Sequence, residues 1–439
     1  MTDRFKQILA LALPIIGGMV SQNVLNLVDT AMVGSLGDTA LAAVGAGSFA
    51  NFLCVAFVMG LSSGVQAMAA RRLGEDRAAE LAVPLNGGLL LALVLSIPLS
   101  AGFTAIAPNV FPWLAPDPEV ADLGVPYLQA RLLAMAAVGM NFAFRGYWNG
   151  INLSKVYLRT LVAMHAINIV LNYGLIFGEL GMPKLGAVGA GVASAAATWA
   201  GSLIYIGQAL ALARDKGFLR GLPDRETMKT MLRLSLPTGI QQFLFAGGWV
   251  ALFAILGRMS TQDAAAANVL INVMLVALLP GIGLGMAASS LVGQALGRHD
   301  ADDAKAWGWD VVKVAVLIMG GIGLGMALAP DLVLAPFLEN PETAELARDP
   351  LRVFGLFIGL DAVGLVLMNA LLGAGDAKRV AVVATSLQWG LFLPVAALLG
   401  PVLGFGLLSI WIAQIGYRVL QAGVFAALWQ RGRWASVQV

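Results

Sequence analysis

The sequence is short of the residues on which most soluble functions depend. Only 12% of its 439 residues are charged, and it contains a single cysteine, Cys54, and two histidines. One cysteine cannot form an internal disulfide, and so few scattered thiols and imidazoles predict no metal site. The net charge of +2 indicates no polyanionic partner such as a nucleic acid. No P-loop or catalytic constellation is present, so we expect neither an enzyme nor a cofactor.

Apolar surface is what the sequence has in abundance, since 59% of its residues are hydrophobic. A soluble globule of this size cannot bury so much apolar surface, and we therefore expect lipid to surround most of the chain. A helix that crosses a bilayer needs about 20 mostly apolar residues, and twelve runs meet this length. They lie at 7–34, 40–70, 81–106, 123–149, 156–178, 186–213, 230–257, 263–295, 307–334, 350–372, 379–400 and 403–430. The predicted fold class is an all-α membrane protein with twelve transmembrane helices.

The distribution of basic residues predicts the orientation of these helices. Lys and Arg concentrate at the amino terminus, in the tail, between the sixth and seventh runs, and after the second, fourth, eighth and tenth runs. The loops on the other side carry only Lys184, Arg258, Arg348 and Arg352. By the positive-inside rule both termini are expected in the cytoplasm. The sequence therefore predicts a multi-pass protein of the cell membrane, which is the inner membrane in a Gram-negative bacterium.

The chain also repeats itself at a constant offset of 223 residues. The matched pairs include Leu13-Pro14 with Leu236-Pro237, Gly60-Leu61 with Gly283-Leu284, and Lys155 with Lys378. Each copy has six spans, so the copies enter the membrane in the same direction, related by a pseudo-two-fold axis along the membrane normal. We expect an N-terminal lobe over 1–213, a cytoplasmic linker over 214–229 and a C-terminal lobe over 230–439. Two lobes that face each other across a cavity are typical of transporters.

Polar residues inside the predicted spans are the candidate functional residues of the first lobe. Asp29 lies late in the first span, and Asn26 and Gln22 share its helix face at i−3 and i−7. A carboxylate in hydrocarbon is costly, so such residues usually line cavities and act. We predict that Asp29 exchanges protons while its neighbours adjust it. The alternative is that the amide side chains hold helices together, which is common in membrane interfaces.

A second polar stripe lies on the fifth span, where His165, Asn168 and Asn172 fall at i, i+3 and i+7. The two stripes could meet and hold a proton, a water molecule or a cation, although helix packing alone also explains His165. In the second lobe, Asp361 lies inside the tenth span and is a candidate second acidic site. The alternative is a carboxylate paired with a basic residue. Pro14 removes a backbone hydrogen bond in the first span and permits a bend there, static or moving.

These residues resemble the multidrug and toxic compound extrusion (MATE) family over nearly the whole chain. The resemblance is carried by the segments 28–34 (VDTAMVG) and 281–297 (GIGLGMAASSLVGQALG), and by Asp361-Ala followed by Gly375-Asp376. It combines NorM-like and DinF-like features. It implies that Asp29 is the central coupling residue and that Pro14 is the bending proline of the first span.

The chain departs from both subgroup patterns. DinF-like members have Asn-x-x-x-Asp in the fifth span, where this chain has Asn168 and Asn172. NorM-like members join a tenth-span aspartate, matched by Asp361, to a seventh-span glutamate. The glutamate position is Phe245 here, and the nearest polar residues are Gln241 and Gln242. The resemblance therefore leaves the coupling ion open between H⁺ and Na⁺.

The predicted function is secondary active antiport by alternating access, in which amphipathic, mostly cationic drugs or toxic metabolites leave in exchange for H⁺. The expected partners are these small molecules and the lipid bilayer, and we expect a monomer. Na⁺ as the coupling ion is the first alternative. A lipid-precursor flippase is the second, and it needs a basic cavity for phosphate; only Arg131, Arg145, Lys313 and Arg418 lie in or near spans. A membrane scaffold or receptor that transports nothing is the third.

Overall fold

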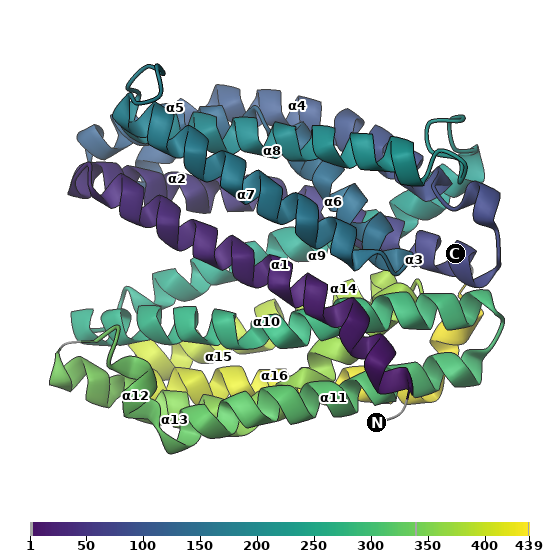
Figure 1. Ribbon diagram of the computed structural model, residues 1–439. Coiled ribbons are helices and arrows are strands. Elements are labelled where there is room, and N and C mark those ends of the chain that lie inside the picture. Colours follow the sequence, from purple (N-terminus) through teal and green to yellow (C-terminus); the bar gives the residue numbers. More distant parts are fainter. Residues whose placement is uncertain (1–2, 339, 438) are drawn as a thin grey trace. The chain divides into compact units, whose positions relative to one another are not determined.

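The fold is all-helical, as predicted. The structure, a computed structural model, describes residues 3–338, 340–437 and 439, and no strand occurs among them. Among these described residues, eleven helices are long and apolar enough to cross a membrane, and there are twelve when a pair bent by 48°, Pro118–Leu132 with Met135–Gly150, is counted as one span. All twelve predicted spans are therefore confirmed, and Figure 1 shows them as long helices joined by short connections.

The first six spans are built from eight α-helices. These are α1 (Asp3–Gly34), α2 (Asp38–Ala56) and α3 (Gly60–Gly74), α4 (Val83–Leu114), α5 (Pro118–Leu132) and α6 (Met135–Gly150), α7 (Ser154–Phe177), and α8 (Gly186–Leu212). The short η1 (Phe57–Met59) joins α2 to α3, and η2 (Ala78–Glu80) precedes α4. The span over residues 38–74 is therefore three consecutive elements, and the fourth span is the bent pair α5 and α6.

The last six spans follow the same order. They are α9 (Arg225–Leu256), α10 (Thr261–Gly297), α11 (Ala301–Leu328) followed by the short α12 (Pro330–Leu334), α13 (Pro341–Gly373), α14 (Ala377–Leu387) with η3 (Gln388–Phe392), α15 (Leu393–Ala397) and η4 (Leu398–Val402), and α16 (Gly406–Arg431). The tail adds η5 (Arg433–Ser436). The eleventh span thus contains two π-helical turns, which locally widen an otherwise α-helical segment.

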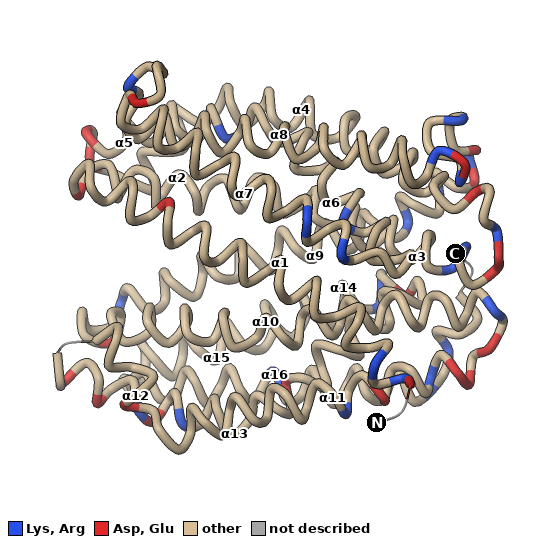
Figure 2. The backbone as a smooth tube through the Cα atoms, viewed as in Figure 1, with Lys and Arg blue, Asp and Glu red and all other residues tan. Residues whose placement is uncertain are grey.

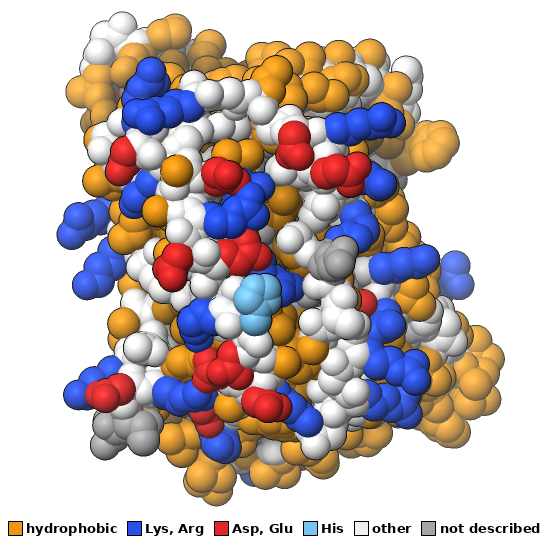
Figure 3. All heavy atoms as spheres, turned by 90° about the vertical axis from the view of Figure 1, so that its right-hand side faces the viewer, with side chains coloured by type: hydrophobic (Ala, Val, Ile, Leu, Met, Phe, Trp, Pro, Cys, Tyr) orange, Lys and Arg blue, Asp and Glu red, His pale blue; other side chains and the backbone are white. Residues whose placement is uncertain are grey.

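Several helices begin directly after a residue that caps them, and the observed bounds differ from the predicted runs by up to nine residues, as at α13, which begins at Pro341 and not at 350. Asp117, Ser260, Asp300 and Asn340 each precede a helix and accept a backbone N–H from its first turn. Many large apolar side chains stay exposed on these helices, such as Leu27 at 71% and Leu203 at 67%, as is expected of helices that are surrounded by lipid. Charged residues gather near helix ends and in loops (Figure 2). One end of the molecule carries clustered Lys and Arg side chains among Asp and Glu, bordered by hydrophobic side chains (Figure 3).

The chain divides into two compact units whose boundaries fall inside helices. Unit 2 is Gly17–Phe243, and unit 1 combines the chain up to Ile16 with Leu244–Val439. The first part of α1 therefore belongs with the second half of the sequence, and the first part of α9 belongs with the first half. The sequence predicts the boundary in the linker 214–229 instead; these units describe contacts, and the division of the chain into working lobes stays a prediction.

Glycines allow these exchanged helix segments to pack closely. In unit 2, a Cβ at Gly60 of α3 would overlap the backbone of Ser235 and Gly239 on α9. In unit 1, a Cβ at Gly283 of α10 would overlap the side chain of Ile16 on α1. The two contacts are equivalent under the offset of 223, which relates Gly60 to Gly283 and Ile16 to Gly239. Each copy of the repeat thus packs the start of its first helix against the other copy.

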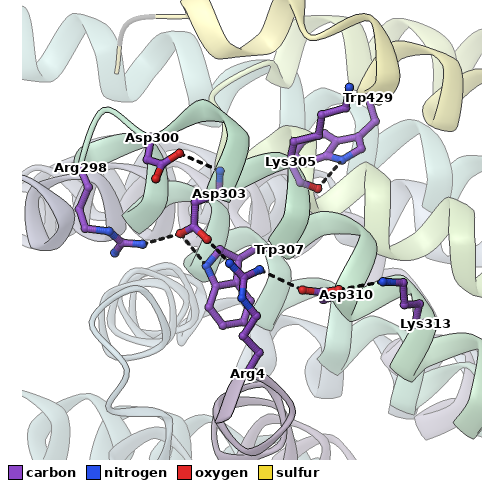
Figure 4. A network of polar contacts seen from close by, with 9 residues as sticks. All are labelled: Arg4, Arg298, Asp300, Asp303, Lys305, Trp307, Asp310, Lys313 and Trp429. Carbon is purple, nitrogen blue, oxygen red and sulfur yellow. Dashed lines mark hydrogen bonds and ion pairs between the residues drawn. The ribbon is translucent and has the colours of Figure 1, made fainter. Parts of the chain in front are cut away.

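Polar contacts fix the same two segments at their starts. In unit 1, Arg4 of α1 binds Asp303 and Asp310 of α11, the latter at 2.9 Å, and stacks over the Trp307 ring at 4.4 Å (Figure 4). In unit 2, Arg72 of α3 donates to the Thr227 hydroxyl of α9 at 3.2 Å.

The cap of α9 lies just before Thr227. Asp224 accepts the Thr227 N–H at 3.2 Å, and hydrogen bonds from Thr227 hold the pKa of the Asp224 carboxyl below its usual value. The predicted linker is also held in place: Asn86 of α4 binds the carbonyls of Gly217 and Gly221, and Phe218 between them is fully buried. The beginning of the linker is therefore a docked part of unit 2.

Candidate functional site

The central candidate residue, Asp29, meets the fifth predicted span directly. Asn172 of α7 donates from its amide nitrogen to Oδ1 of Asp29 on α1, at 2.6 Å. The same amide donates to Oδ1 of Asn168 at 2.9 Å, and Asn168 donates to the Ser194 hydroxyl of α8 at 3.2 Å. Asn172 and Asn168 are buried and Asp29 is partly buried. Asp29 thus begins a hydrogen-bonded chain that links three helices of unit 2.

A second group of polar residues joins the same two helices nearer the start of α1. Gln22 donates to Oδ1 of Asn26 at 3.1 Å, and its own Oε1 lies 3.1 Å from Nε2 of His165 on α7. The other imidazole nitrogen lies 2.7 Å from the Ser21 hydroxyl. The two predicted stripes therefore do meet, as two hydrogen-bonded groups between α1 and α7. Asn26 is exposed, so it contributes from the edge of this contact.

Three residues of this region were not predicted as site residues. Ser21 and Ser194 are hydroxyl partners of the predicted residues, and serine is too common in membrane helices to mark such a role. Arg131, at the end of α5, places a positive charge that acts on Asp29. The sequence showed Arg131 only as a basic residue near a span, because nothing in its spacing relates α5 to α1.

The second acidic residue, Asp361, lies in unit 1 and is already paired. Nη2 of Arg418 on α16 is 2.6 Å from Oδ1 of Asp361 on α13, and Nη1 of Arg418 donates to Gln421 at 3.0 Å. The Asp361 and Arg418 side chains are only 9% and 17% exposed. This is the pairing that the sequence left open as the alternative. Its charge is compensated within unit 1, and whether Asp361 also serves as a second acidic site stays a prediction.

Two further predicted positions, Phe245 and Pro14, lie on the first helix of each copy of the repeat. Phe245, at the position of the missing glutamate, packs edge-on against Trp249 on α9, and its carbonyl accepts from Gln388 at 3.3 Å. Pro14 lies inside α1, and the helix continues past it to Gly34. Pro14 is two residues before Ile16, where unit 1 ends on this helix. Within residues 3–338, 340–437 and 439, no group of three or more His, Cys, Asp or Glu side chains is placed to hold a metal ion.

Comparison with known proteins identifies the family. The MatE family model matches residues 14–174 and 237–398, well over half of the chain. The chain belongs to the MATE family. The two matched stretches begin at Pro14 and Pro237, which are separated by the offset of the repeat. Asp29, Asn168, Asn172 and Asp361 all lie inside the matched stretches of this MATE protein, whereas Arg418 lies beyond them.

Relatives of this MATE protein are similar along almost their whole length. A protein of Thermotoga maritima described as a probable multidrug resistance protein NorM is 26% identical over 98% of this chain and 93% of its own length. A protein of Pseudomonas aeruginosa with the same description is 28% identical over 94% of this chain and 86% of its own.

Solved structures agree in fold. A MOP superfamily transporter from Pyrococcus furiosus matches with a TM-score of 0.89 at 22% identity, over 100% of this chain and 98% of that chain. A MATE structure described as the straight conformation gives 0.88 at 23% identity, over 98% and 96%. At identities of 22% and 23%, these matches show a similar fold and not a similar activity.

Proposed function

We propose that this chain is a secondary active antiporter that exports amphipathic, mostly cationic drugs or toxic metabolites in exchange for H⁺ by alternating access. The observation that carries the proposal is the pairing of Asp29 with Asn172 between two apolar helices. An ionised carboxylate among such helices is costly unless it is paired. The protonation of Asp29 is therefore tied to how α1 packs against α7. A proton gradient that changes the protonation of Asp29 can in this way change the packing of the two helices.

The hydrogen-bond pattern favours H⁺ over Na⁺. Hard cations such as Na⁺ bind several oxygen ligands, but Asn172 presents an N–H donor to Asp29. Oδ1 of Asn172 is buried and has no hydrogen-bond partner among the described residues. A rotation of this amide would turn an acceptor toward Asp29, which suits a protonated carboxyl. Asn172 can thus form a hydrogen bond to Asp29 in both protonation states. A Na⁺ ion could not bind the N–H donor of Asn172, and the amide would offer it only one oxygen ligand.

The charges elsewhere support a coupling site in unit 2. A cation reaches Asp361 only by displacing Arg418, which costs a buried ion pair. A lipid-precursor flippase is less well supported, since two of the four basic residues that it needs have acidic partners. Arg418 faces Asp361, and Lys313 binds Asp310 at 3.0 Å.

The remaining proposals, on oligomeric state, location and hinge, keep the predictions made from the sequence. We infer a monomer of the cell membrane, the inner one in a Gram-negative bacterium, with both termini in the cytoplasm. Pro14 is proposed as the hinge of α1, because it lies close to the boundary between the two units. No cofactor and no catalysed reaction are part of this proposal.

The experiment is transport in proteoliposomes with separately imposed proton and sodium gradients. The probe is the tetraphenylphosphonium cation, and we expect the proton gradient alone to drive its export. Asp29→Asn should abolish proton-driven export while the protein still accumulates. Asn172→Ala should slow it about tenfold or more, because a hydrogen bond to a charged group contributes about 1.5–3 kcal/mol.

Two matched variants serve as controls. Asp38→Asn removes an exposed carboxylate at the start of α2, and Asn23→Ala removes an α1 amide whose contact is with the Met19 carbonyl of its own helix. Both should transport like the parent protein. Full proton-driven export by Asp29→Asn would remove Asp29 from the mechanism, and export driven only by sodium would replace the proton as the coupling ion.

A further inference from the structure

Arg145 is a cation inside the first half of the chain that the proposed transport mechanism does not use. It lies on α6, five residues before the helix ends at Gly150, or about 7.5 Å along the helix axis. Its Nε donates to the hydroxyl of Ser62 on α3 at 3.1 Å, and its guanidinium lies over the Phe142 ring at 4.5 Å. The Tyr157 hydroxyl of α7 is a further hydrogen-bond partner.

The electrostatics of Arg145 differ from those of the other arginines in or near the spans. Arg418 pairs with Asp361, the charge of Arg131 acts on Asp29, and Arg72 lies 4.0 Å from Glu80. In the described part of the chain, Arg145 has only neutral partners. A guanidinium held among apolar helices without a negative charge is costly, and such residues mark substrate or ion pathways.

The polar set around Arg145 is also not required by the repeated framework. The offset of 223 relates Arg145 to Met368, Ser62 to Gly285 and Tyr157 to Val380. The second copy of the repeat thus builds the same helices with apolar or small residues at all three positions. Helix packing alone therefore does not account for the polar residues of the first copy.

The guanidinium of Arg145 has N–H donors left for one more hydrogen-bond partner. A guanidinium has five N–H donors, and the Ser62 hydroxyl accepts from one of them, the Nε–H. Ser62 and Tyr157 are buried, whereas Arg145 keeps partial exposure. Guanidinium groups pair with carboxylate and phosphate through two parallel hydrogen bonds. Arg145 is thus oriented by neutral side chains, and it keeps N–H donors that the Ser62 hydroxyl does not occupy.

We propose that Arg145, Ser62 and Tyr157 form an oxyanion-binding subsite in unit 2, which takes the carboxylate or phosphate group of an amphipathic ligand. The inference rests on the proposed export function. The oxyanion comes either from a zwitterionic substrate or from an anionic lipid headgroup. Unit 2 then has one acidic residue, Asp29, and one basic subsite, and the basic subsite favours amphipathic molecules that carry an oxyanion.

The test compares two dyes that differ at one group, tetramethylrhodamine with a free carboxylate and its methyl ester. Gradient-driven export of both is measured in proteoliposomes of the full chain, made with and without phosphatidylglycerol. If substrate supplies the oxyanion, Arg145→Gln slows tetramethylrhodamine at least about tenfold, or about 1.4 kcal/mol, relative to the methyl ester. If lipid supplies it, phosphatidylglycerol raises the melting temperature of the parent but not of Arg145→Gln, and both dyes are exported alike.

Further variants keep the test decisive if Arg145→Gln does not accumulate. Arg145→Lys keeps the charge and should keep most of the preference for the free carboxylate, while Ser62→Ala should lose part of it. Arg159→Gln removes an exposed arginine of α7 and should change nothing. Equal slowing of both dyes without any lipid effect would make Arg145 a structural residue and overturn the proposal. Failure of the parent protein to export either dye would instead refute the proposed function.

Discussion

At the scale of single residues, the buried ion pair of unit 1 makes a sharp prediction. Removing one partner by Asp361→Asn leaves Arg418 buried without a counter-charge. We expect a loss of about 3–5 kcal/mol of stability, because breaking a buried pair costs far more than the pair contributes. Replacing both residues, with Asp361→Leu and Arg418→Met, should recover most of this loss. The measurement is thermal unfolding in detergent, with the exposed pair Arg352 and Asp349 as the control.

The same variants test the role of Asp361 in coupling. If the doubly substituted protein keeps proton-driven export, the pair is structural and the coupling ion binds in unit 2. Equal destabilisation by the single and double changes would show that the charges do not stabilise one another. Loss of a sodium response alone would place a coupling site in the second lobe after all.

Single residues also show what helical spacing can predict. The i−3 and i−7 spacing around Asp29 and the i+3 and i+7 spacing on α7 marked residues that meet between α1 and α7, because helical geometry fixes which side chains share a face. The partners of those residues were beyond reach. Arg418 and Ser194 contact their partners across helices that are separated in sequence, and no local pattern carries that information.

At the scale of helices, the two equivalent glycine contacts should differ in tolerance. A Cβ at Gly60 meets backbone atoms of α9, which cannot move aside, whereas a Cβ at Gly283 meets the Ile16 side chain, which can change rotamer. We therefore expect Gly60→Ala to cost more stability than Gly283→Ala, within the range of about 1–3 kcal/mol typical of overpacking. Melting temperatures in detergent give the comparison.

A glycine without neighbours supplies the control for this prediction. Gly102 of α4 is exposed, and a Cβ added there would meet no atom within 4 Å. Gly102→Ala should be neutral or stabilising by up to about 1 kcal/mol, because alanine has the better helix propensity. If all three substitutions had the same effect, close packing at Gly60 would not contribute to stability.

The helices themselves were the most predictable feature. Runs of about 20 apolar residues mark spans because every backbone group must be satisfied inside the helix in lipid. The sequence did not reveal how single spans are subdivided. The break between α5 and α6 at Leu133 and Ala134 contains residues that also suit a regular helix. The π turns over 388–392 and 398–402 contain Gly390, Gly400 and Pro401, which disfavour a regular helix but do not specify what replaces it. Side-chain packing from neighbouring helices decides such details.

At the scale of the whole molecule, the repeat was visible but the exchange of helix segments was not. The offset of 223 relates Gly60 to Gly283 and Gly239 to Ile16. It is equally consistent with helices that pack within their own copy and with helices that pack on the other copy. The lobe boundary in the charged linker therefore stays a prediction, while the two compact units divide inside α1 and α9. A distinction between such arrangements requires knowledge of which surfaces touch.

The exchange predicts how the chain behaves when it is divided. A fragment of residues 1–222 contains six spans but lacks the part of α9 that covers Gly60 and supplies Met231, which is fully buried. We expect this fragment to be degraded when it is expressed alone, because unit 2 would expose packed helix surface. A fragment of residues 1–243 completes unit 2 and should accumulate to a clearly higher level.

Expression of the complementary piece provides the second half of this test. Residues 223–439 restore the missing part of α9 in trans, so co-expression with 1–222 should rescue both fragments and recover proton-driven export. The measurement is the amount of each fragment in the membrane, followed by transport in reconstituted vesicles. Equal accumulation of 1–222 and 1–243 would show instead that the first six spans form an independent lobe. The boundary would then lie in the linker 214–229, and the hinge between working lobes would have to be sought there instead of at Pro14.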